Sequence, residues 1–351
     1  SSARPTATSA PQPTVTPTAT STPQPTATAT ATATPSPTPS PTPTPPPSPA
    51  PLSVGTTIYT YRGHSQGMRA LAWSPSGNRV ATASDDYTAQ VWDATTGNNA
   101  IIYRGHSSYV EGVAWSPNST RIVSGSADTT VQIWDPNTGN SIYTYHGHNL
   151  WVNRVGWSPD AKRIVSGEQS STVGQVVTVQ IWDANTGNTL VIYRGHTNGV
   201  YAVNWSPDGT RIASAGYDGT LQVWDAATGQ SIATYNGGGI YLFGLSWSPD
   251  GSRVAIGSSN NTVLIIDASN GNLLSTYNGH SAWVKDVAWS PDSSRIASGS
   301  DDATVHLWDS STSNNLYIYS GQSGHVNAVG WSPDSKLIAS GGTSVQVWQA
   351  E

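Results

Sequence analysis

The 351-residue chain contains no cysteine, so neither disulfide bonds nor thiolate chemistry contribute to its structure or function. Charged residues make up only 10% of the chain, against about 25% in an average soluble protein. The formal net charge is −6 and no basic stripe is present, so we do not expect nucleic acid as a partner. The chain also lacks an apolar run of about 18 residues, so we expect no membrane insertion.

The short motifs of common enzyme chemistry are missing as well. The sequence has no phosphate-binding loop, no nucleophile elbow and no histidine cluster with the spacing of metal ligands. We interpret the adjacent aspartates Asp85 and Asp86, and likewise Asp301 and Asp302, as turn residues. We therefore predict that the chain is not an enzyme and that it holds no metal and no cofactor.

Residues 1–51 differ from the rest of the chain in composition. They hold 16 of the 24 prolines, 15 threonines and a single charge, Arg4. No apolar period exists there, so we predict an extended polyproline II segment, either a plain linker or a stalk or assembly arm. Since the chain begins at Ser1, we expect that a signal peptide or a larger N-terminal part has been removed. Threonine beside proline is also typical of O-glycosylated stalks, and the candidate sites are Thr14, Thr16, Thr18, Thr26, Thr28, Thr38, Thr42 and Thr44.

One repeat fills the remaining 300 residues. The tripeptide Trp-Ser-Pro occurs seven times, at intervals of 42 residues except for one interval of 48. A period of about 40–45 residues with four short strands is the signature of a propeller blade. One such unit cannot bury its own apolar face, whereas seven can close into a ring and bury these faces between neighbours. The tryptophans of these tripeptides are Trp73, Trp115, Trp157, Trp205, Trp247, Trp289 and Trp331.

Within each unit, short β-branched and aromatic runs alternate with Gly, Pro, Asn and Asp, as in hairpin-linked strands. Five units also carry a Gly-His pair before the Trp-Ser-Pro tripeptide and a Trp-Asp pair after it. On these motifs, over residues 56–351, the chain resembles the WD-repeat β-propeller family, of bacterial type. The resemblance implies an all-β domain at 52–351 with seven blades of four antiparallel strands. The Gly-His pairs begin at Gly63, Gly105, Gly147, Gly195 and Gly279, and the Trp-Asp pairs begin at Trp92, Trp134, Trp182, Trp224 and Trp308.

The ends of the repeat region predict how the ring closes. The last unit ends at Trp348 after only three strands, so its fourth strand must come from elsewhere. Residues 57–61 lie before the first Gly-His pair and match residues 141–145 and 231–235. We therefore predict that this N-terminal strand is the outer strand of the last blade, as is usual in the family that the chain resembles.

The resemblance further implies a hydrogen-bonded set of His, Ser or Thr, Asp and Trp inside a blade. An imidazole between a carboxylate and a hydroxyl has both ring nitrogens satisfied, and a buried indole N–H needs an acceptor. We interpret these sets as structural rather than as catalytic triads, because the constellation recurs in four blades whereas an active site occurs once. The sets are His64, Thr82, Asp86 and Trp92; His106, Ser124, Asp128 and Trp134; His196, Ser214, Asp218 and Trp224; and His280, Ser298, Asp302 and Trp308.

Three blades, numbered by their Trp-Ser-Pro tripeptides, depart from this pattern. We predict that blade 5, which has none of the four residues, relies on apolar packing and opens more easily than blades 2 or 6. Blade 3 has six extra residues around Gln169–Gln175 where the Asp is expected, blade 5 carries Gly238, Ile256, Asn260 and Ile266 at the four positions, and blade 7 has Gln322 in place of His.

Two tryptophans, Trp151 and Trp283, fall outside the repeat, and each lies six residues before a Trp-Ser-Pro tryptophan. In the family that the chain resembles, this position faces the upper rim of the ring. Exposed aromatic residues around a pocket suit peptide or protein partners, and they also suit sugar faces. The alternatives are a protein or peptide site, a carbohydrate site, or side chains that merely cover the blade ends. The rim candidates are Tyr109, Glu111, Trp151, Asn153, Tyr201, Tyr217, Tyr241, Phe243, Trp283, Lys285 and His325.

These features predict a non-catalytic scaffold outside the cell or on the cell surface. We expect its ring to contact other protein chains, among them copies of itself, with the Thr/Pro-rich segment as the arm of a filament. Glycans on the tail are part of the same hypothesis. The alternative is a sensor or docking domain of a larger membrane protein, such as a bacterial kinase, because similar propellers often follow such linkers.

Overall fold

The computed structural model describes residues 53–170 and 175–351. The chain divides into two units, residues 1–50 and residues 51–351. The predictions made for residues 1–51, including the eight O-glycosylation candidates, lie outside the described residues, as does part of the insertion around Gln169–Gln175.

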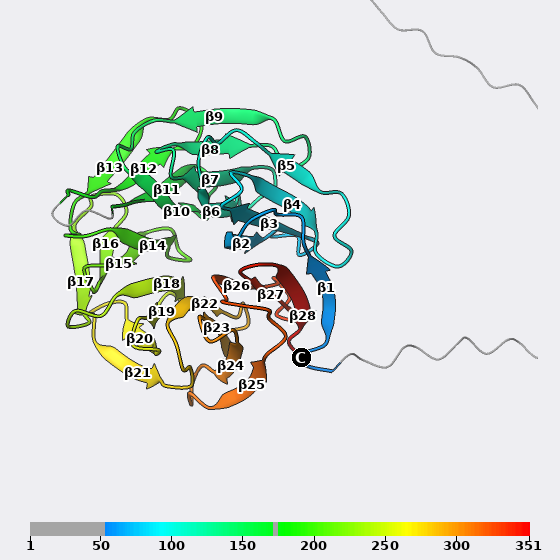
Figure 1. Cartoon of the computed structure of the whole chain (residues 1–351). Helices are drawn as coiled ribbons and strands as arrows, with labels where there is room; N and C mark the ends of the chain where they lie inside the picture. The colour runs from blue at the N-terminus through cyan, green and yellow to red at the C-terminus, as the bar shows by residue number, and fades with distance from the viewer. Residues whose placement is uncertain (1–52, 171–174) are drawn as a thin grey trace, which may run out of the picture. The chain divides into compact units, whose positions relative to one another are not determined.

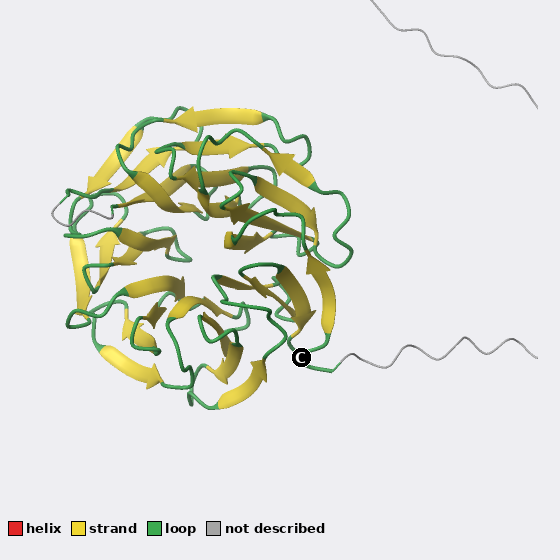
Figure 2. Ribbon diagram, viewed as in Figure 1, coloured by secondary structure: helices red, strands yellow, loops and turns green. Residues whose placement is uncertain are grey.

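The described residues form 28 strands and no helix. The strands build seven antiparallel sheets of four strands each, which surround a central opening as the blades of a ring (Figures 1 and 2). The predicted all-β, seven-bladed propeller is thus confirmed. Blade 1 consists of β2 (Met68–Trp73), β3 (Arg79–Ser84), β4 (Ala89–Asp93) and β5 (Ile101–Tyr103), and blade 2 of β6 (Val110–Trp115), β7 (Ile122–Ser126), β8 (Val131–Trp134) and β9 (Ser141–Tyr145).

The other five blades follow the same plan, with the first strand of each nearest the central opening (Figure 1). Blade 3 consists of β10 (Trp151–Trp157), β11 (Arg163–Gln169), β12 (Val179–Asp183) and β13 (Thr189–Tyr193), and blade 4 of β14 (Val200–Trp205), β15 (Arg211–Gly216), β16 (Thr220–Asp225) and β17 (Ser231–Asn236). Blade 5 consists of β18 (Leu242–Trp247), β19 (Arg253–Ser258), β20 (Val263–Asp267) and β21 (Leu273–Tyr277), and blade 6 of β22 (Val284–Trp289), β23 (Arg295–Ser300), β24 (Val305–Asp309) and β25 (Asn315–Tyr319). Blade 7 consists of β26 (Ala328–Trp331), β27 (Leu337–Gly341), β28 (Val345–Gln349) and β1 (Thr57–Tyr61).

Blade 7 contains both ends of the propeller. Strand β1 pairs antiparallel with β28, and Tyr61 lies opposite Val345 in the ladder. The blue and red ends of the ribbon therefore lie side by side in one sheet (Figure 1). This pairing confirms the predicted closing strand.

The Trp-Ser-Pro tryptophans join neighbouring blades around the channel. The indole N–H of Trp115 donates to the Ala72 carbonyl of the previous blade at 3.1 Å. Across the closure, Trp73 donates to the Gly330 carbonyl at 3.0 Å. In blades 1–6 an arginine at the start of the second strand, or immediately before it, lies 4.5–5.8 Å from the tryptophan ring centroid of the next blade. These arginines are Arg79, Arg121, Arg163, Arg211, Arg253 and Arg295. Such cation–π contacts add to the apolar packing between blades.

The outer strands reach over the next blade through a tyrosine. Tyr103 of β5 stacks on Trp134 of blade 2 with ring centroids 4.8 Å apart and an interplanar angle of 2°. Five equivalent pairs stack at 4.3–5.0 Å. Because each stack joins two blades, the buried core of the ring lies largely between sheets, as the repeat pattern requires.

Candidate functional site

The predicted hydrogen-bonded sets form inside blades 2 and 4. In blade 2, His106 Nδ1 lies 2.9 Å from Asp128 and Nε2 lies 2.8 Å from the Ser124 hydroxyl. The Trp134 indole also donates to Ser124, at 3.2 Å. Blade 4 repeats the arrangement with distances of 2.8, 2.8 and 3.1 Å.

In blades 1 and 6 the histidines make both predicted contacts, at 2.8–2.9 Å. The predicted indole bond is wrong for these two blades, because Trp92 and Trp308 have no hydrogen-bond partner at Nε1 among the described residues. In blade 1 the hydroxyl predicted to accept from the Trp92 indole is that of Thr82. This hydroxyl instead donates to the Gln90 carbonyl, at 3.3 Å. Both indoles are fully buried, and stacking against a tyrosine holds each in place.

These sets hold a carboxylate and an imidazole in a fixed relation. Burial lowers the pKa of His280, although Asp302 opposes the effect, so the neutral ring donates from Nδ1 and accepts at Nε2. Burial raises the pKa of Asp218, but the hydrogen bond and charge of His196 and backbone N–H groups outweigh it and bring the pKa to about 2. The recurrence of this pairing inside the blades supports its structural interpretation.

Blade 3 has a complete set, which the sequence pattern missed. Glu168, near the end of β11, places Oε1 3.2 Å from His148 Nδ1, and His148 Nε2 lies 2.6 Å from Ser166. The other oxygen of Glu168 accepts from the backbone N–H and the hydroxyl of Thr178, at 2.7 and 2.8 Å. The longer side chain of glutamate reaches the same place from a position earlier in the chain, before the insertion, so blade 3 does not lack its carboxylate.

Blades 5 and 7 differ as the sequence indicates. In blade 5, Ile256 and Ile266 are fully buried in an apolar cluster, and Asn260 bonds to the hydroxyls of Ser258 and Thr262. In blade 7, the amide of Gln322 donates to the Ser340 hydroxyl at 2.8 Å, in the way that histidine contacts serine elsewhere. The Trp348 indole donates to the same hydroxyl at 2.9 Å.

The rim candidates lie around one end of the channel, which we call the upper mouth. Register shifts occur in the inner strands of blades 1–6 at this point, and such bulges turn a side chain out of the ladder. The residue four before each Trp-Ser-Pro tryptophan lies here, so that every blade contributes one side chain, and these are Arg69, Glu111, Asn153, Tyr201, Phe243, Lys285 and Asn327.

An aromatic cluster occupies the part of the upper mouth formed by blades 4–6. Its rings are 5.0–6.3 Å apart and come from Tyr201, Tyr217, Tyr241, Phe243 and Trp283. Tyr241 and Trp283 are each 43% exposed, but Phe243 is fully buried beneath them, so the prediction that Phe243 offers a binding surface is wrong. The Lys285 ammonium lies 4.5 Å from the Phe243 ring centroid and 4.8 Å from that of Trp283, and burial lowers its pKa.

A second group of aromatic side chains lies over blades 1–3. The ring centroids of Tyr87 and Tyr109 are 5.5 Å apart, and the Trp151 side chain is 44% exposed. A pocket of about 310 Å³ opens between the two groups, and it brings together seven rim candidates, Tyr109, Glu111, Trp151, Asn153, Tyr201, Tyr217 and Lys285, with Arg69. His325 lies in a neighbouring hollow that also contains Lys285 and Asp301.

The charges of the upper mouth are mostly paired or buried. Arg69 donates to Asp85 at 2.7 Å, and Lys285 lies 3.7 Å from Asp301. Glu111 and Asn153 are at most 9% exposed, so they form the floor of the pocket rather than its rim, contrary to their predicted place on the surface. Burial raises the pKa of Glu111, although the charge of Arg69 opposes this.

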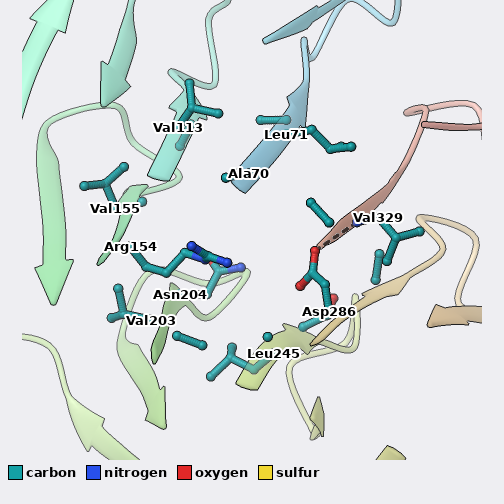
Figure 3. A pocket seen from close by; sticks show the side chains of 18 of the residues that line it. Ala70, Leu71, Val113, Arg154, Val155, Val203, Asn204, Leu245, Asp286 and Val329 are labelled. Atoms are coloured by element: carbon teal, nitrogen blue, oxygen red, sulfur yellow. Dashed lines mark hydrogen bonds between the residues drawn. The ribbon is translucent and has the colours of Figure 1, made fainter. Parts of the chain in front are cut away.

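Below the upper mouth, the channel holds two charged residues that sequence reasoning missed. Arg154 and Asp286 point into a cavity of about 370 Å³ (Figure 3). Burial raises the pKa of Asp286 to about 6, against the charge of Arg154. A Cβ on Gly244 would collide with Asp286, and one on Gly112 would crowd the backbone at Arg154. Arg154 and Asp286 each lie three residues before a Trp-Ser-Pro tryptophan, and the other five blades carry Ala or Gly at that position. This contrast was the signal in the sequence that could have identified the two charged residues.

The described residues of the upper mouth offer flat aromatic faces with a few fixed polar groups. Such a surface is suited to recognition, because aromatic side chains supply a large contact area at a low cost in conformational entropy. In the described part of the chain, no helix has the length and apolarity needed to cross a membrane.

A ring of seven four-stranded blades, with histidine–carboxylate pairs inside five of them, defines the class of this protein as a WD-type propeller. The repeat family described as WD domain, G-beta repeat matches residues 55–93, 97–135, 139–173, 187–225, 271–309 and 313–349. The chain therefore belongs to the WD-repeat family. The domain described as Anaphase-promoting complex subunit 4 WD40 domain matches residues 236–283, which include all four strands of blade 5. No curated protein matches the chain.

Proposed function

We propose that this propeller is a non-catalytic scaffold, outside the cell or on its surface, that assembles with copies of itself. WD-repeat propellers generally serve as scaffolds that bind other proteins, which is the basis for the broad assignment. In this proposal the upper mouth of one copy receives the Thr/Pro-rich segment 1–51 of another. The observation that carries the proposal is the set of exposed aromatic rings around the pocket of the upper mouth.

Proline-rich segments in the polyproline II conformation bind to grooves lined by aromatic side chains, because the segment loses little conformational entropy on binding. The upper mouth offers such rings, with Tyr109 37% exposed and Trp151, Tyr241 and Trp283 each 43–44% exposed. Residues 5–51 carry no charge, so their docking would not remove a charged group from water. The chemistry of the segment therefore complements that of the upper mouth.

The geometry of such a contact would favour a polymer. An extended segment of 51 residues spans roughly 160 Å at about 3.1 Å per residue, which is enough to reach a neighbouring ring. The contact is heterologous, because the arm of one copy meets a different surface on the next. Heterologous contacts that do not close into a ring generate filaments. An extracellular place for this polymer is supported by the low charge of the chain and by the threonine-rich composition of the arm.

Binding of the arm can be tested with a labelled peptide of residues 11–47 and the full chain, read by fluorescence anisotropy. We expect saturable binding that weakens at least about tenfold, or about 1.4 kcal/mol, in a variant with Trp151→Ser and Trp283→Ser. Ile142→Ser is the matched control, because Ile142 is 51% exposed on the outer strand β9, and this variant should bind as the wild type does. A peptide with alanine at every proline should not bind. Binding that is absent, or equal in all three proteins, would refute this proposal.

A further inference from the structure

Blade 6 differs from the other blades that contain a histidine–carboxylate pair at one interior position. His306 of β24 lies where a glutamine stands in blades 1–4. There the glutamine amide donates to a neighbouring threonine hydroxyl at 2.9–3.1 Å and to the carbonyl before the paired histidine at 3.0–3.3 Å. The equivalent glutamines are Gln90, Gln132, Gln180 and Gln222. Blade 6 therefore exchanges an amide donor for a second imidazole.

The second imidazole lies against the first. The rings of His280 and His306 are in contact, with centroids 3.9 Å apart and an interplanar angle of 31°. Asp302 Oδ2 lies 2.8 Å from His280 Nδ1. One ligand atom from each of these three residues lies within 4.8 Å of the others, and both histidines are buried. Two imidazoles and a carboxylate are a common ligand set for divalent transition metals.

We propose that His280, Asp302 and His306 form a binding site for a divalent transition-metal ion such as Cu²⁺ or Zn²⁺. Two ligands at right angles around an ion, with bonds near 2.0–2.1 Å, are about 2.9 Å apart, and two tetrahedral ligands are about 3.3 Å apart. The distance of 2.8 Å between His280 Nδ1 and Asp302 Oδ2 is that of a hydrogen bond, and it lets both atoms occupy neighbouring positions on one ion. The ion would replace the proton that His280 Nδ1 shares with Asp302, and that proton would pass to solvent.

The residues around the three ligands are arranged to orient them. His280 Nε2 is held by the Ser298 hydroxyl at 2.8 Å, and Asp302 Oδ1 accepts from the Thr304 hydroxyl at 2.6 Å. Tyr277 lies 2.8 Å from His306 Nδ1. With its proton on Nδ1, His306 donates to Tyr277 and keeps Nε2 available, and no described residue forms a hydrogen bond to Nε2. Outer partners of this kind fix the orientation of metal ligands.

One of the three ligands, His306, adjoins a pocket, whereas His280 and Asp302 do not line it. A pocket of about 420 Å³ is lined by His306, Tyr277, Gly279 and Asn315, among others. An ion held by three protein ligands keeps a further position for water or another ligand. Among the described residues, no other blade combines the histidine–carboxylate pair with a third ligand.

The site can be tested on the full chain by titration with Cu²⁺ and Zn²⁺ in a calorimeter, and by electron paramagnetic resonance of the Cu²⁺ form. We expect one tight equivalent, and a spectrum that shows coupling to two imidazole nitrogens. His306→Gln should fold normally, because four other blades carry glutamine here, and it should bind at least about 100-fold more weakly, since loss of an outer partner alone costs about 10–100-fold. Mg²⁺ and Ca²⁺, which prefer oxygen ligands, should not compete.

A gain-of-site variant offers an independent check. Gln132→His in blade 2 places an imidazole beside His106 and Asp128, and we expect it to add a second equivalent of Cu²⁺. The proposal is overturned if the wild type binds neither ion, or if the wild type and His306→Gln bind with equal affinity and the same spectrum.

Discussion

Equivalent repeat positions carry similar residues inside the blades and different residues at the upper mouth. Inside blades 1, 2, 4 and 6 the same four positions carry His, Ser or Thr, Asp and Trp, and the contact between histidine and aspartate recurs at 2.8–2.9 Å. Four residues before each Trp-Ser-Pro tryptophan, at the upper mouth, six residue types occupy seven blades. Positions that repeat hold the fold, whereas positions that differ between blades are free to recognise a partner. Variants at equivalent positions of different blades can therefore be compared directly, with one blade as the control for another.

Blade 5 forms without the residues that recur in the interiors of the other blades. It keeps four strands and a closed position in the ring without a histidine–carboxylate pair, because Ile256, Leu264 and Ile266 fill its interior. The network is thus one way to complete a blade interior and not a requirement of the architecture. What all seven blades share is the burial of apolar surface against their neighbours.

The largest expected effect comes from deleting an interior ring. Trp134→Ala removes a fully buried side chain that stacks on Tyr103 and donates to Ser124. We expect it to lower the free energy of unfolding by about 3–5 kcal/mol, measured by denaturant titration, because a large cavity remains. A loss below about 1 kcal/mol would mean that the interior positions are not what holds the blade.

A smaller loss should follow from removing the carboxylate of the same blade. Asp128→Ala leaves the His106 Nδ1–H and the Ser107 N–H without their acceptor, which should cost about 1–3 kcal/mol. Asn260→Ala in blade 5 is the matched control, and its cost should be about 1 kcal/mol, since no histidine depends on Asn260. Equal losses in the two variants would remove the distinction between networked and apolar blades.

Local opening should separate the same two blades. We predict that backbone amides of β19 and β20 in blade 5 exchange with solvent faster than those of β7 and β8 in blade 2, because blade 5 lacks the network that ties its loop to its interior. Native-state hydrogen exchange followed by mass spectrometry measures the difference. Equally slow exchange in both blades would count against the prediction.

Acid should destabilise the folded protein by protonating the carboxylates that pair with histidine. The pKa of Asp218 is about 2 in the folded protein and 3.8 as its ordinary value, so the unfolded chain binds this proton first. The stability that the group contributes is complete above about pH 4 and is lost as the pH falls towards about 2. Asp218→Asn should therefore show a smaller decrease in melting temperature across this interval than the wild type. An unchanged pH dependence would contradict the shift.

The smallest effect on stability is expected at the upper mouth. Trp151→Ser changes a side chain that is 44% exposed and should alter the free energy of unfolding by no more than about 0.5 kcal/mol, whereas Trp283→Ser also uncovers Phe243 and should cost about 1 kcal/mol. Denaturant titration of both variants beside Trp134→Ala makes the contrast direct. A loss of several kcal/mol would show that these rings serve the fold, as the interior tryptophans do.

The sequence predicted the ring, its closure and most of the histidine contacts, because these depend on residues at constant spacing within one repeat. The equivalents of His106, Ser124 and Asp128, for instance, occur with the same sequence spacing in other blades. Glu168 escaped this reasoning, since the length of its side chain compensates for its different place in the chain. Spacing alone cannot detect such a compensation.

Features made by several blades together were beyond the pattern. Arg154 and Asp286 come from blades 3 and 6, and only ring closure brings both into one cavity. Phe243 occupies a rim position in the repeat, yet the rings of its neighbours cover it. The proximity of His306 to His280 follows from the pairing of β23 with β24, which sequence spacing does not reveal. The depth and the neighbours of a side chain are decided by packing between sheets.

The proposed assembly requires that the upper mouth of one copy receives the arm of another. Electron microscopy of the full chain, as wild type and as the double variant with Trp151→Ser and Trp283→Ser, tests this claim. We predict strings of seven-bladed rings for the wild type, with density over the upper mouth, and dispersed single rings for the double variant. Single rings in both samples, or filaments that persist in the double variant, would contradict it.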